Sequence, residues 1–242
     1  MAKYISRTIE NDILQRLTDK KAIIIFGARQ VGKSTLLKQL LKDNKTVLWL
    51  YGDQAQTQSL FSDLSVPGIK SIIGNNKIVV IDEAQMIRDI GVKLKMFTDY
   101  LNDVKVIATG SSSFDLANKV NEPLTGRKWE YHLLPLSFKE MAASSSVFEE
   151  LGHLETRLIY GYYPEVVMNP NEKKERLLEL VTSYLYKDVL IWENLHKAEK
   201  ITKLLQALAF QVSLFQNHKM KYCKVRKAAR QRTADIRTND TF

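Results

Sequence analysis

The 242-residue chain has few of the features that mark membrane or secreted proteins. Its single cysteine, Cys223, cannot form an internal disulfide. No apolar run approaches the ~20 residues that a membrane-spanning helix needs, and the first residues contain no apolar stretch of signal-peptide length. We therefore expect a cytoplasmic protein that has no membrane partner.

The sequence also lacks histidines spaced as metal ligands, and its positive charge is not spread along the whole chain. The four histidines include no pair with the spacing of metal ligands, so we assign them no role. The net charge is +9, but residues 212–242 contribute +6 of it, from eight Lys and Arg residues against two Asp. The rest of the chain is close to neutral, which argues against a large nucleic-acid footprint. A weak nucleic-acid contact through the basic tail stays open.

Short apolar runs alternate with helical patterns along the first part of the chain, which is typical of an α/β fold with a parallel sheet. The apolar runs predict five strands at residues 22–26, 46–50, 77–81, 104–108 and 129–133. Apolar residues at helical spacing follow the first strand and recur over 90–101. Ser137 and Glu140 have the spacing of a capping box and predict a further helix start there.

The character of the sequence changes near residue 145, where three serines suggest a short linker. We expect a core at 1–145, a helical lid at 146–212 and a basic, disordered tail at 213–242.

Residues Gly27 to Ser34 fit the P-loop (Walker A) pattern G-x-x-x-x-G-K-[ST] in full, between a predicted strand and a predicted helix. Such a loop turns backbone N–H groups toward phosphates, and Lys33 adds a cation near the β and γ phosphates. The Ser34 hydroxyl is the expected ligand of Mg²⁺. The alternative, a glycine-rich turn without a ligand, is disfavoured by this context. The expected phosphate-binding residues are Gly27, Ala28, Arg29, Gln30, Val31, Gly32, Lys33, Ser34 and Thr35.

The acidic pair Asp82 and Glu83 directly follows the third predicted strand and resembles a Walker B motif. We expect Asp82 to hold Mg²⁺ and Glu83 to act as the general base toward the attacking water. Taken alone, an acidic pair after a strand is equally typical of a solvated turn, and the upstream P-loop decides for the catalytic interpretation.

Three further positions are candidate catalytic residues. Thr109, with Ser111 second, is expected to sense the γ-phosphate at the end of the fourth strand, although these hydroxyls could instead cap a helix. Arg127 is a candidate for stabilising transition-state charge, in its own chain or across an interface, and Arg29 is a weaker one. Exposed arginines are more often simply solvated.

As a set, these motifs resemble the prokaryotic AAA-type ATPases of the AAA_14 family, whose members usually carry a DUF4143 region after the core. The matching stretches are 27–34, 79–85, 109–113, 126–127, 134–140 and 161–167. The resemblance implies an additional-strand P-loop core and a helical lid. It also implies that Pro164, in Gly161-Tyr-Tyr-Pro164, contacts adenine, unless it only breaks a helix.

The chain departs from the family pattern after Val212, and a truncated or frame-shifted C-terminus explains this more simply than a functional basic arm. No guanine-reading Asn-Lys-x-Asp motif is present. The favoured function is Mg²⁺-dependent ATP hydrolysis that drives or gates a conformational change. The alternatives are a slow nucleotide-dependent switch and an ATPase-gated nucleic-acid-binding protein. Binding of ATP and ADP is expected, and a homo-oligomer or a protein partner stays open.

Overall fold

The fold is described from a computed structural model, over residues 4–62, 65–110, 120, 123–182, 203–204 and 206–208. The chain divides into two compact units, Met1–Leu177 and Leu178–Phe242, and everything below concerns the first unless stated. Ser111 and the predicted tail lie outside the described residues, as does most of the segment between 183 and 212.

The first unit is built on a sheet of five parallel strands in the order β2-β3-β4-β1-β5. The strands are β1 (Ala22–Phe26), β2 (Val47–Tyr51), β3 (Ile78–Asp82), β4 (Lys105–Gly110) and β5 (Lys128–His132). Each overlaps a predicted strand, with ends that differ by no more than two residues. Strand β4 lies between β1, which precedes the P-loop, and β3, which carries the acidic pair. The predicted α/β fold with an additional strand is therefore confirmed.

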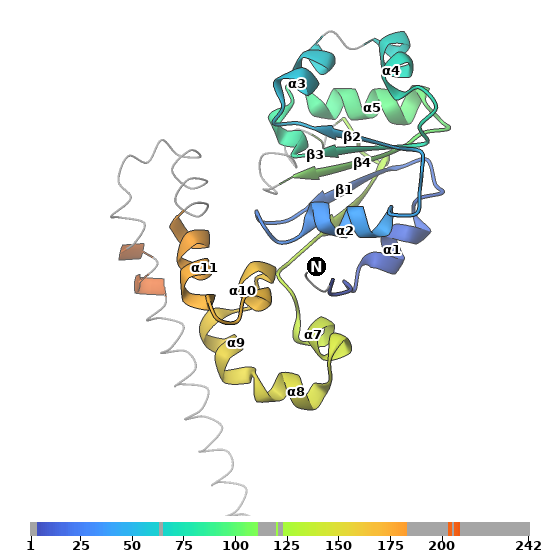
Figure 1. Cartoon of the computed structure of the whole chain (residues 1–242). Coiled ribbons are helices and arrows are strands. Elements are labelled where there is room, and N and C mark those ends of the chain that lie inside the picture. The colour runs from blue at the N-terminus through green and yellow to red at the C-terminus, as the bar shows by residue number, and fades with distance from the viewer. Residues whose placement is uncertain are drawn as a thin grey trace, which may run out of the picture. The chain divides into compact units, whose positions relative to one another are not determined.

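Helices cover both faces of this sheet (Figure 1). One face carries α1 (Glu10–Gln15) and α2 (Lys33–Leu40); the other carries α3 (Ala55–Ser62), α4 (Val66–Ile73) and α5 (Ile90–Tyr100). A short 3-10 helix, η1 (Ala84–Met86), follows β3. All regular elements described after β5 are helices: α7 (Phe138–Ser144), α8 (Val147–Gly152), α9 (Leu154–Tyr160), α10 (Pro164–Met168) and α11 (Lys173–Leu180).

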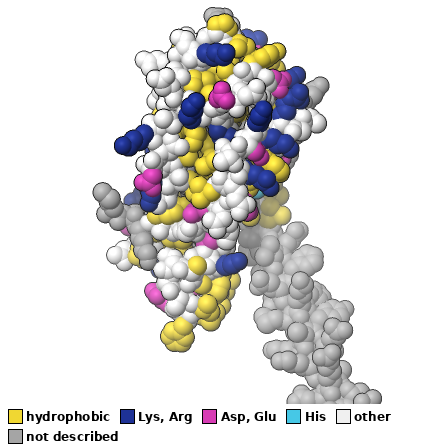
Figure 2. All heavy atoms as spheres, turned by 90° about the vertical axis from the view of Figure 1, so that its right-hand side faces the viewer, with side chains coloured by type: hydrophobic (Ala, Val, Ile, Leu, Met, Phe, Trp, Pro, Cys, Tyr) yellow, Lys and Arg dark blue, Asp and Glu magenta, His cyan; other side chains and the backbone are white. Residues whose placement is uncertain are grey.

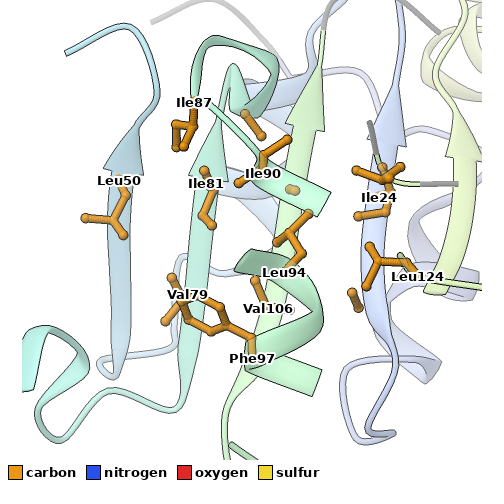
Figure 3. Packing of buried hydrophobic residues seen from close by; sticks show 14 of the residues in the cluster. Ile24, Leu50, Val79, Ile81, Ile87, Ile90, Leu94, Phe97, Val106 and Leu124 are labelled. Atoms are coloured by element: carbon orange, nitrogen blue, oxygen red, sulfur yellow. The ribbon is translucent and has the colours of Figure 1, made fainter. Parts of the chain in front are cut away.

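Alternation along the strands explains the two layers of core. In β1, Ala22, Ile24 and Phe26 belong to the cluster under α5, whereas Ile23 and Ile25 belong to the cluster under α2. All five side chains of β1 are buried, as expected for a strand covered on both faces. Figure 3 shows how side chains of α5 and of the loop before it meet side chains from β1, β2, β3 and β4. This packing fixes the carboxyl ends of the strands, where the site lies.

The start of α7 is the predicted capping box. The Ser137 hydroxyl accepts the Glu140 N–H, and the Glu140 carboxylate accepts the Ser137 N–H at 2.8 Å. The predicted linker at residues 144–146 is a tight connection, because α7 ends at Ser144 and Ser146 caps α8. A domain boundary near 145 stays a proposal, and the two compact units divide between residues 177 and 178.

Helices α8 and α9 expose several large apolar side chains, which we call the α8–α9 surface. Figure 2 shows apolar side chains at the lower end of the described part, the level at which α8 lies in Figure 1. The members of this surface are Val147, Phe148, Leu151, Leu154, Leu158 and Ile159. Among the described helices, none has the length and apolar character to cross a bilayer.

Candidate active site

The P-loop connects β1 to α2, and at two of its positions the structure requires glycine, for a different physical reason at each. A Cβ on Gly27 would lie 2.5 Å from the carbonyl oxygen of Leu133, so the close approach of the loop to the chain after β5 requires glycine. Gly32, the N-cap of α2, has φ +100°, a conformation that side chains rarely adopt. Gln30 also has a positive φ, of 59°. The loop therefore has the curled backbone that turns N–H groups inward.

Lys33 is the first residue of α2, and only 4% of its side chain is exposed. Its Nζ donates to the carbonyl oxygens of Gly27 and Ala28, each at 3.0 Å, and lies 4.0 Å from Oε1 of Glu83. The cation is thus held between the P-loop and the end of β3, where the sequence places the β and γ phosphates.

Asp82, at the end of β3, is buried and accepts two hydroxyl hydrogen bonds. Its Oδ2 accepts from the Ser34 Oγ at 2.6 Å, and its Oδ1 accepts from the Thr109 Oγ1. The two predicted Mg²⁺ ligands, from segments 48 residues apart, therefore meet. Hydroxyl and carboxylate oxygens suit Mg²⁺, which completes its shell with water and phosphate oxygens. No group of three or more His, Cys, Asp or Glu residues forms within the described ranges, and this kind of site needs none.

Glu83 follows with a left-handed backbone, φ +51° and ψ +45°. Its N–H donates to the Thr109 Oγ1 at 3.2 Å. The carboxylate accepts from the Gln85 Nε2 at 2.6 Å through Oε2, and its other oxygen is the one near Lys33. The sequence analysis assigned no role to Gln85, although Gln85 is the last residue of the matching stretch 79–85.

Thr109 is fully buried, and the contacts of its hydroxyl are with Asp82 and with the main chain of Glu83. It lies in β4, and the hydroxyl residues that follow it in the sequence lie outside the described residues. These contacts place it beneath the acidic pair, and direct sensing of the γ-phosphate stays a prediction.

Arg127 lies at the opposite end of the sheet from the P-loop. Its carbonyl oxygen accepts the N–H of Ala22, the first residue of β1, whereas the P-loop begins after the last. The length of β1 separates the two by roughly 16 Å at about 3.3 Å per residue. Its guanidinium pairs with Asp99 at 2.7 Å. This placement does not support action within the same chain, and of the two predicted roles only the one across an interface stays open.

A cavity of about 530 Å³ lies against the P-loop, within the usual range for small-molecule sites. P-loop residues 30 and 32–35 and Glu83 line one side. Pro164 lines it too, and its contact with adenine stays a prediction. The sequence analysis missed the remaining lining residues, which are Tyr4, Ile5, Arg7, Leu136, Glu165, Met168 and Asn169. They come from the N-terminal segment and from the chain around α7 and α10.

Arg7 ties the N-terminal segment to the P-loop and to α7. Its guanidinium donates to the Val31 carbonyl at 3.1 Å, to the Leu134 carbonyl and to Oε1 of Glu140 at 3.2 Å. Each side chain of the Arg7–Glu140 pair is only 5% exposed. Burial raises the pKa of Glu140, but N–H donors from Thr8 and Ser137 and the charge of Arg7 outweigh it. The pKa of Glu140 therefore lies below its ordinary value, and the pair is ionised at neutral pH.

Comparisons with known proteins agree with this geometry. Residues 19–142, about half of the chain, match the AAA_14 family, described as an AAA domain. Residues 151–238 match a domain of unknown function, DUF8612, which continues past the predicted boundary at 212.

Relatives in sequence are two uncharacterized proteins of Methanocaldococcus jannaschii. MJ1544 is 27% identical, and the match covers 88% of this chain and 51% of MJ1544. MJ1637 is 28% identical, and the match covers 71% of this chain and 35% of MJ1637. The chain thus spans about half or less of these relatives.

The fold is similar to that of the Walker-type ATPase PABY2304 of Pyrococcus abyssi, with a TM-score of 0.55 at 18% identity. That similarity covers 79% of this chain and 76% of the other. The motifs, the strand order and the family match agree, and the chain belongs to the AAA_14 family of prokaryotic AAA-type P-loop ATPases.

Proposed function

We propose that this chain binds ATP with Mg²⁺ in the P-loop cavity and hydrolyses the bond between the β and γ phosphates. The observation that carries the proposal is the 2.6 Å hydrogen bond from Ser34 to Asp82, with Lys33 and Glu83 beside it. This bond brings the P-loop together with the proposed ligands of Mg²⁺, and the proposed base follows Asp82 directly. The family and the fold support nucleotide binding in general.

In this proposal each side chain has a separate task. The N–H groups of the P-loop and Lys33 bind the β and γ phosphates, and the start of α2 adds the positive end of its dipole. Ser34 and Asp82 would hold Mg²⁺, which would supply positive charge against the charge that develops on the phosphate oxygens. Glu83 accepts a proton from the water that attacks the γ-phosphorus. The bond from that phosphorus to the bridging oxygen breaks, and ADP and phosphate leave.

The apolar part of the cavity lining is the proposed site of the base. Pro164 and Met168 of α10 lie there together with Ile5, which gives a flat ring an apolar surface. Adenine is the base that the family resemblance implies. Because Arg7 links the P-loop to the start of α7, occupation of the cavity would be felt by the helices that follow. This link supports the further proposal that ATP hydrolysis drives or gates a conformational change.

The same link favours a second candidate function, a nucleotide-dependent switch with little turnover. Phosphate release separates the two, because a switch releases about one phosphate per chain whereas an ATPase continues. An ATPase-gated nucleic-acid-binding protein has less support. Figure 2 shows Lys and Arg side chains scattered over the visible face of the described residues rather than gathered in a stripe. The low cysteine content supports a cytoplasmic location.

The test of the proposal uses three variants of the protein. Lys33→Ala should bind ATP far more weakly, since the loop loses its buried cation. Glu83→Gln should keep the affinity and lose turnover by about 10²–10⁴-fold, because an amide cannot take the proton of water. Lys38→Ala is the matched control, because Lys38 is an exposed lysine on the same helix.

Affinity is measured with a fluorescent ATP analogue, with Mg²⁺ and with EDTA, and turnover by phosphate release. Hydrolysis by Glu83→Gln at the original rate would show that Glu83 is not the base. Binding that is equal for Lys33→Ala and Lys38→Ala would reject the site.

A further inference from the structure

We propose that Gln85 is a positioning residue for Glu83. Its amide holds one carboxylate oxygen so that the other faces the phosphates. This inference rests on the proposed function, because it concerns the base of that reaction. It is carried by the contacts on the two sides of one carboxylate. Oε2 accepts from the Gln85 Nε2 at 2.6 Å, and Oε1 lies 4.0 Å from the Lys33 Nζ.

The local backbone explains how Gln85 reaches its neighbour. Glu83 has a left-handed conformation, and η1 begins directly after it. The turn brings the side chain two residues later back over the carboxylate. Gln85 is 7% exposed whereas the Glu83 side chain is 32% exposed, so a buried amide holds a partly solvated acid. A buried amide that loses its partner costs about 1–3 kcal/mol, so the contact is favoured to persist.

The main chain of Glu83 is constrained as well. Its N–H donates to the buried Thr109 hydroxyl, and its carbonyl lies so close to Gly52 that a Cβ there would be 2.4 Å away. A left-handed non-glycine residue costs about 1–2 kcal/mol, and such conformations persist where the surroundings enforce them. The backbone therefore fixes where the side chain begins, and Gln85 fixes where it ends.

Without Gln85 the carboxylate would have two competing positions. It could turn toward solvent, since a third of the side chain is already exposed, or close the 4.0 Å distance to Lys33 and form a tight ion pair. Either movement takes the accepting oxygen away from the water that it must deprotonate. Misplacement of a reacting group by about 1 Å can reduce rate about 10²-fold. Gln85 thus acts on the rate through Glu83 and not on nucleotide affinity.

The test replaces Gln85 by Met, which keeps the side-chain length and removes the donor. The expected result is a kcat about 10–100-fold lower, with unchanged affinity for an ATP analogue. Gln85→Glu should be slower still, because a second carboxylate repels the first. The matched control is Asn76→Leu, which removes an amide bond of similar length, 2.8 Å to the Ile73 carbonyl, before the amino end of β3 and away from Glu83. It should turn over ATP like the parent protein.

A double-mutant cycle distinguishes positioning from a structural role. In the Glu83→Gln background, Gln85→Met should not lower the residual single-turnover rate further, because a residue that acts through Glu83 has nothing left to position. A decrease of the same size in both backgrounds, or parent-like turnover of Gln85→Met, would overturn the proposal. Full activity of Glu83→Gln alone would instead reject the base assignment, so the two failures are separate outcomes.

Discussion

The Arg7–Glu140 pair is the contact through which the N-terminal segment, the P-loop and α7 hold one another. Removing either partner should therefore destabilise the protein strongly. Arg7→Met leaves the Glu140 carboxylate buried without its cation and the Val31 carbonyl without its donor. Glu140→Gln keeps the size of the side chain, and its amide oxygen can still accept the Ser137 N–H. It leaves the arginine charge unpaired, however.

The expected magnitude follows from the burial of both charges. Breaking a buried ion pair by removing one partner costs about 3–5 kcal/mol. For a chain of this size, that corresponds to a decrease in Tm of roughly 10 °C. The double variant Arg7→Met/Glu140→Met replaces both charges with apolar groups, and such replacements are often neutral in other proteins. We therefore expect its loss to be much smaller than the sum of the single losses.

The assay is thermal and urea denaturation of the parent, the two single variants with Met at position 7 or 140, and the double variant. A coupling free energy of more than about 1 kcal/mol is the expected result. The affinity of Arg7→Met for ATP should also fall, because the Val31 carbonyl belongs to the P-loop. Losses that add to within about 0.5 kcal/mol would show that the two side chains act independently and would refute the reasoning.

Three other predictions concern pH, the strand ends and the interface. The pKa of Glu140 in the folded protein lies below its ordinary value of 4.5. The stability that the carboxylate provides is therefore complete above pH 4.5 and is lost as the pH falls through the folded pKa. The difference in urea midpoint between the parent and Glu140→Gln should shrink accordingly in acid. Gly52→Ala should lower turnover, because its Cβ would clash with the main chain of the proposed base, whereas Gly152→Ala, with nothing within 4 Å, should not. Mixing Arg127→Ala with Lys33→Ala chains should restore part of the phosphate release if the arginine acts across an interface, and no restoration would leave it without a catalytic role.

Much of the core and of the site could be predicted because both depend on local patterns. A continuous β-branched run such as Ala22–Phe26 predicts a strand covered on both faces, and the P-loop pattern specifies the turn that follows it. The placement of Arg127 could also have been predicted. A residue that precedes a strand of a parallel sheet lies at the amino end, away from a loop that follows another strand.

The missed residues act through contacts that no spacing reveals. Arg7 reaches Glu140 across 133 residues, and only the folded chain brings them together. The capping box predicted Glu140 as a helix cap, but its second role as the partner of a buried arginine left no trace in the local pattern. Gln85 was missed for a related reason, since its importance depends on the left-handed backbone of the residue two positions earlier.

The α8–α9 surface has a consequence for the handling of the protein. Phe148 is 89% exposed and Leu158 76%, and apolar side chains grouped in this way favour association between molecules in solution. At low ionic strength the net charge of +9 keeps molecules apart. Salt at about 1 M reduces the screening length to roughly 3 Å and removes that protection. Concentrated samples should therefore stay monodisperse in dilute buffer and become turbid as salt is added. A protein whose molecules attract one another through opposite charges shows the reverse, because salt screens that attraction and raises its solubility.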